Sequence, residues 1–114
     1  MATQRRPIPQ RRASPRINVD LGCQFIVNET EHKALIKNIS AVGALLWSGF
    51  MPPPAADVSI KIGTSLLKLP IILQCKIVRR SRVNTEQGPM GAFAVRFSRS
   101  SPALMGLISK LVGP

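Results

Sequence analysis

Five arginines lie within the first 16 residues, and no acidic residue precedes Asp20. Two of them frame the stretch Arg12-Ala-Ser-Pro-Arg16, with three residues between them. A guanidinium group is a planar fork that pairs with two phosphate oxygens or with O6 and N7 of guanine, and its face stacks on a purine. The arginines therefore indicate an anionic partner, and DNA, RNA or a membrane surface would each suit a polycation.

A second group of polar residues lies in the stretch Asn38-Ile39-Ser40-Ala-Val-Gly43. If a strand ends here, alternation places Asn38 and Ser40 outward together and Ile39 in the core. Gly43 would then allow a positive φ or the close approach of a ligand. By itself, this pattern is more typical of a polar β-turn that contains a glycine.

The basic charge is not confined to the N-terminal arginines. The net charge is +11, and removing residues 1–16 takes away five arginines and no acid, which leaves +6. No run of about 18 apolar residues is present, and no apolar segment follows the first arginines as in a signal peptide. The sequence therefore predicts a cytoplasmic protein with an anionic partner and no membrane insertion.

The residue types that usually support catalysis or metal binding are scarce. Five acidic residues and one histidine, His32, offer no paired carboxylates and no Ser-His-Asp arrangement. Cys23 and Cys75 stand apart in apolar stretches without a CxxC motif, which predicts two buried free thiols. We expect no enzyme, no metal and no cofactor, and we expect His32 at the surface.

The chain divides into a short basic arm and one domain. Residues 1–16 contain three prolines and few aliphatic residues, which predicts a flexible arm that becomes ordered only when a ligand binds. Residues 17–114 form the domain, and short β-branched or aliphatic runs separated by turn residues predict six or seven strands in it. These runs cover residues 21–27, 32–40, 43–47, 57–62, 66–83 and 91–97.

The last stretch, SSPALMGLISKLV, follows a helical pattern instead. Ser101 is a candidate N-cap, Pro102 suits the first helical position, and leucines recur at 104, 107 and 111. The overall prediction is an all-β antiparallel barrel, or alternatively a sandwich, with one amphipathic C-terminal helix that caps it.

The two polar motifs together resemble the PilZ family. The family pattern is RxxxR followed by [D/N]xSxxG on a six-stranded antiparallel barrel with a C-terminal helix, and GAFAVRF at 91–97 resembles its last strand. The resemblance covers nearly the whole chain. It implies a stand-alone receptor for cyclic di-GMP that passes the signal to an unknown protein effector, in motility, flagellar or exopolysaccharide machinery, through a changed surface.

The resemblance also implies the binding residues. The expected contacts to cyclic di-GMP are Arg11, Arg12, Arg16, Asn38, Ser40, Gly43 and Arg80. Arg11, directly before the RxxxR motif, resembles the family members that hold a stacked dimer of the ligand. Asn38 stands where many members have Asp, and an amide oxygen accepts the N–H groups of guanine less strongly than a carboxylate does.

A nucleic-acid-binding β-barrel is the alternative function that the charge leaves open. Barrels that bind single strands use aromatic side chains as stacking platforms. This chain has four Phe, one Trp and no Tyr, which makes nucleic acid the less favoured partner.

Overall fold

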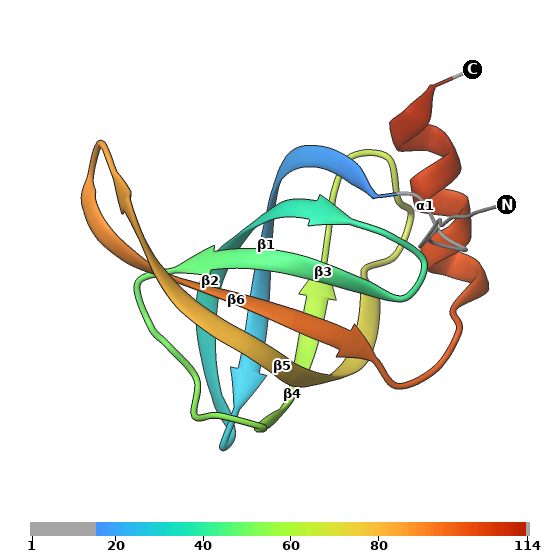
Figure 1. Cartoon of the computed structure of the whole chain (residues 1–114). Helices are drawn as coiled ribbons and strands as arrows, with labels where there is room; N and C mark the ends of the chain where they lie inside the picture. The colour runs from blue at the N-terminus through green and yellow to red at the C-terminus, as the bar shows by residue number, and fades with distance from the viewer. Residues whose placement is uncertain (1–15, 114) are drawn as a thin grey trace, which may run out of the picture.

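The computed structural model describes residues 16–113, which form a closed antiparallel barrel of six strands followed by one helix (Figure 1). The strands are β1 (Ile17–Val27), β2 (Thr30–Ile39), β3 (Gly43–Ser48), β4 (Asp57–Ile62), β5 (Ile71–Thr85) and β6 (Gly88–Phe97), and the helix is α1 (Pro102–Val112). They hydrogen-bond around the barrel in the order β1-β2-β3-β6-β5-β4. This confirms the predicted barrel, with six strands.

Alternation of side chains builds the core. In the first half of β5, every second residue from Ile71 to Ile77 is buried, while Ile72, Gln74 and Lys76 face outward. The larger core side chains include Phe25 and Phe93, whose rings meet edge to face at a centroid distance of 5.1 Å. One face of each strand therefore fills the barrel, and the exposed residues of the other face are available for binding.

The helix begins and packs as its sequence predicts. Ser101 is the N-cap, and its Oγ accepts a hydrogen bond from the Leu104 backbone N–H at 3.1 Å. Leu104 and Leu107 are buried in the barrel core. The apolar stripe of α1 thus supplies the cap that the pattern indicated, and no described helix is long and apolar enough to cross a membrane.

The β5–β6 hairpin differs from the prediction at both ends of β5. The strand begins at Ile71 rather than at Leu66, because Pro70 has no N–H for the ladder and Thr64 accepts the Leu66 amide in a local turn at 2.8 Å. At the other end, the turn expected over 84–91 shrinks to two residues between Thr85 and Gly88. The resulting long hairpin projects beyond the barrel (Figure 1).

Three β-bulges interrupt the pairing of the strands. They lie between Asn18 and Leu21 in β1, at Lys37 in β2 and at Val78 in β5. A bulge adds a residue to one strand and re-aims the side chains around it. The bulges in β1 and β2 therefore lie next to Asn38. The bulge in β5 turns Arg79, rather than Arg80, to the outer face.

Cys23 and Cys75 are buried free thiols, as predicted. Burial raises the pKa of each thiol from 9.0 to about 12, and the neighbouring Cys23 raises that of Cys75 further. Both thiols are therefore protonated at neutral pH and pack as small apolar groups.

Candidate ligand-binding site

The second arginine of RxxxR lies against the first residue of NxSxxG. The Nη1 of Arg16 donates a hydrogen bond of 3.0 Å to Oδ1 of Asn38, across 22 residues of sequence. Pairing of Asn18 with Asn38 in the β1–β2 ladder sets this distance, because it brings the start of β1 beside the end of β2. Since Asn38 is neutral, it holds the guanidinium of Arg16 without cancelling its charge.

Asn38 faces the outside of the barrel. Asn38 pairs with Leu45, and Leu45 pairs with Ala94, so these three residues share one face of the sheet. This is the outer face, because the neighbours of Ala94 in β6, Phe93 and Val95, point into the core. A hollow of about 470 Å³ adjoins Asn38 on this face. Its lining consists of Asn18, Val19, Asp20, Lys37, Asn38 and Leu45.

Ser40 does not project beside Asn38, which corrects the sequence-based prediction. Strand β2 ends at Ile39, and Ser40 turns inward with 1% of its surface exposed. Its Oγ accepts the backbone N–H groups of Val42 and Gly43, each at 3.2 Å. The hydroxyl therefore stabilises the β2–β3 turn from inside.

Gly43 does not adopt the positive φ that the sequence allowed for it. A Cβ at this position would lie 2.4 Å from the carbonyl oxygen of Val95, so the missing side chain is what lets β3 approach β6. Gly43 therefore fixes the position of the β2–β3 turn against β6, and this turn lies next to Asn38.

Arg80 points to the face of the sheet opposite to that of Asn38. It pairs with the core residue Phe93, and its Nη1 donates to the carbonyl oxygen of Pro52 at 3.2 Å. Arg79 pairs with Ala94 instead and therefore shares the outer face with Asn38. The extra residue Val78 causes this exchange, since it shifts the alternation by one position.

The loop that holds Arg80 also contacts His32. The imidazole of His32 stacks on the ring of Phe50 at a centroid distance of 3.9 Å and is half-buried. His32 therefore lies at the surface only in part, because Phe50 in the loop after β3 covers one side of its ring.

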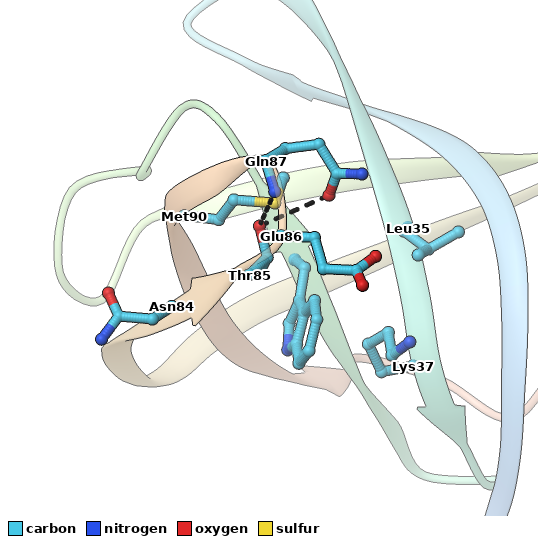
Figure 2. Close-up of a pocket in the computed structure, with 8 residues that line it drawn as sticks. Leu35, Lys37, Asn84, Thr85, Glu86, Gln87 and Met90 are labelled. Carbon is cyan, nitrogen blue, oxygen red and sulfur yellow. Dashed lines mark hydrogen bonds between the residues drawn. The ribbon is translucent and has the colours of Figure 1, made fainter.

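A second, larger hollow lies beside the first. It measures about 880 Å³ and separates the tip of the β5–β6 hairpin from the outer face of β2 and β3. Figure 2 shows the hairpin residues Glu86, Gln87 and Met90 on one side, with Leu35 and Lys37 on the other. Trp47 also lines this hollow, and Lys37 is common to both hollows.

Comparison with known proteins identifies the family. The sequence matches the PilZ domain over residues 10–113. The chain belongs to the PilZ domain family. No match is found among curated proteins.

Two solved PilZ-related structures share the fold. The PilZ domain of YcgR from Escherichia coli, solved with c-di-GMP, is 14% identical with a TM-score of 0.69, and the match covers 90% of this chain and 89% of that one. The Inhibitor of motility (MotI/DgrA) from Bacillus subtilis is 20% identical with a TM-score of 0.62, and the match covers 87% of this chain and 48% of that one.

Within this PilZ domain, the structure brings together part of the predicted site. Arg16 and Asn38 meet, Ser40 and Gly43 shape the turn beside them, and Arg80 points elsewhere. The predicted contacts at Arg11 and Arg12, and the predicted arm up to residue 15, lie outside the described residues.

Three residues near the PilZ motifs were not predicted as part of the site. Asp20 and Lys37 line the hollow beside Asn38, and Arg79 shares its face. Strand periodicity alone gives no signal for them, because each is placed by a β-bulge. Within residues 16–113, no cluster of three His, Cys, Asp or Glu side chains is suited to a metal ion.

Proposed function

We propose that this PilZ protein is a receptor for cyclic di-GMP, with its binding site on the outer barrel face around Arg16 and Asn38. The observation that carries the proposal is the contact between these two side chains, which joins the two family motifs at one place. Membership of the PilZ family and the YcgR fold relative solved with c-di-GMP support the choice of ligand.

The chemistry of the site suits this ligand. Cyclic di-GMP has two guanines and two phosphates, and guanidinium groups can pair with the phosphates and with guanine O6 and N7. Arg16 is exposed, and its charge is not neutralised by Asn38. Binding replaces the contact to Asn38 by charge-assisted hydrogen bonds, and Arg12 adds a second guanidinium.

Arg79 supplies the far side of the proposed site. Asn38, Leu45, Ala94 and Arg79 follow one another across four neighbouring strands. Three strand spacings amount to about 14 Å. The long side chains of Arg16, beside Asn38, and of Arg79 can therefore reach one ligand between them. Between the two ends lie Leu45, which lines the hollow beside Asn38, and Ala94, a small residue with 8% of its surface exposed.

Isothermal titration of variants tests this assignment. Arg16→Ala and Asn38→Ala are each expected to weaken cyclic di-GMP binding, Arg16→Ala by at least about tenfold, with melting temperatures close to wild type because neither side chain is in the core. Arg79→Ala is expected to weaken binding, and Arg80→Ala is its matched control on the opposite face. Wild-type affinity in Arg16→Ala would refute the site.

The stoichiometry is part of the proposal. A stacked dimer of cyclic di-GMP carries four guanines and four phosphates, and Arg11 would supply the additional guanidinium that it needs. We expect two ligands per chain, and one per chain in Arg11→Leu. An endpoint of one for both proteins would contradict the role of Arg11.

The output is a change of surface rather than a reaction. The ligand and the arginines that hold it would cover the outer face of β2, β3 and β6 and present it to a protein effector in the cytoplasm. The name of the second fold relative, Inhibitor of motility, supports motility machinery as the regulated process. A motility assay in a strain that lacks the protein, complemented with wild type or Arg16→Ala, tests this assignment.

A further inference from the structure

Lys37 occupies a position that the proposed function does not use. It is the extra residue of the bulge in β2, immediately before Asn38. It lines both the hollow beside Asn38 and the larger hollow that contains Trp47 (Figure 2). A change in the position of this one side chain therefore alters the lining of both hollows.

The ammonium group of Lys37 makes two contacts. Its Nζ donates a hydrogen bond to Oδ1 of Asp20, and the same atom lies 4.6 Å from the centroid of the Trp47 ring. Asp20 is 69% exposed, so water and salt weaken the ion pair. The cation–π contact is of the modest kind found at a half-exposed ring.

An anionic ligand beside Asn38 changes the balance of these contacts. Asp20 lines the same hollow, and its carboxylate repels a phosphate unless a cation stands between them. The ammonium of Lys37 already contacts Asp20 beside this hollow, and it is a compact charge with three donors on a flexible stem. A phosphate fixed by the arginines is a better partner than the face of an indole.

We propose that Lys37 is a further ligand-binding residue, which contacts a phosphate of the ligand at Asn38 and leaves the Trp47 ring as it does so. This inference rests on the proposed function. It also gives that function a route to the surface, because binding beside Asn38 uncovers Trp47 in the neighbouring hollow. Movement of the Lys37 side chain thus transmits ligand binding to the larger hollow beside the β5–β6 hairpin.

Calorimetric titration of a double-mutant cycle tests the contact to the ligand. Lys37→Met is expected to bind cyclic di-GMP about fivefold more weakly at low salt. Asp20→Asn, which frees Lys37, is expected to bind as tightly as wild type or more tightly. The double variant decides the matter: it stays weak if Lys37 contacts the ligand, and returns to wild-type affinity if Lys37 only neutralises Asp20, which would overturn the proposal.

The fluorescence of Trp47, the only tryptophan of the chain, tests the link to the second hollow. Cyclic di-GMP is expected to change its emission in wild type and in the control Lys61→Met, whose lysine lines a different hollow. Lys37→Met, saturated with ligand, is expected to show little change because its indole has no cation to lose. An equal change in Lys37→Met would overturn the proposal.

The two readouts separate the inference from the function on which it rests. If wild type binds no cyclic di-GMP, the proposed function is wrong and the inference falls with it. If wild type binds and Lys37→Met matches it in affinity, only the inference is wrong.

Discussion

The substitution Gly43→Ala tests whether this glycine serves the fold or the ligand. A Cβ at position 43 would lie 2.4 Å from the carbonyl oxygen of Val95, a backbone atom held in the β3–β6 ladder. Contacts that short do not persist, so the two strands must separate by about 1 Å, which corresponds to severe overpacking. We expect a loss of about 3 kcal/mol of unfolding free energy.

The assay is thermal and denaturant unfolding of Gly43→Ala beside a matched glycine variant. At about 4–8 °C per kcal/mol for a domain of this size, the loss corresponds to a melting temperature lower by roughly 12–24 °C. Gly22 also lies in a strand, but a Cβ there meets nothing within 4 Å, so Gly22→Ala is expected to melt close to wild type. If Gly43→Ala melts like Gly22→Ala but no longer binds cyclic di-GMP, Gly43 serves the ligand and our interpretation is wrong.

Three further predictions concern the turn, the helix and the thiols. Ser40→Ala removes a buried acceptor from two turn amides and should cost about 1–3 kcal/mol in denaturant unfolding. Ser59→Ala removes one hydrogen bond to Gln74 from a half-buried hydroxyl and should cost less, and equal effects would contradict the role of Ser40. Gly106→Ala should raise stability by about 0.5–1 kcal/mol, because the site is open and helical; a lower melting temperature would contradict this. Since the folded pKa values of Cys23 and Cys75 are raised from 9.0 to about 12, their contribution to stability is complete below pH 9 and is lost as the pH rises toward 12. Unfolding free energies measured from pH 8 to 11 should fall, and a rise would reverse the assigned sign.

The sequence predicts the elements of this fold better than their side-chain directions. Two signals are local in the sequence: the alternation of apolar residues from Ile71 to Ile77 and the helix cap at Ser101. The structure contains both, as predicted. A β-bulge leaves no such signal, because the extra residue depends on the pairing of two strands. Val78 is the example: it turns Arg79 outward and Arg80 toward the Pro52 loop, against the prediction for Arg80.

The candidate site shows the same limit. The motif spacing correctly predicts that Ile39 enters the core, but Ser40 departs from the alternation because β2 has already ended. The contact of Arg16 with Asn38 results from the pairing of β1 with β2. The order of the two motifs in the sequence indicated this contact only because it resembles the PilZ pattern. Asp20 and Lys37 carry no motif, and only the folded chain shows that they share a hollow with Asn38.

Isothermal titration of the full chain with cyclic di-GMP, at low and at high salt and with GTP and a linear guanine dinucleotide as controls, tests the central claim most directly. A site that reads guanine and phosphate together is expected to bind cyclic di-GMP far more tightly than either control and to keep much of its affinity at high salt. Equal affinity for all three nucleotides, or binding that collapses with salt, would show a non-specific basic surface and contradict the assignment.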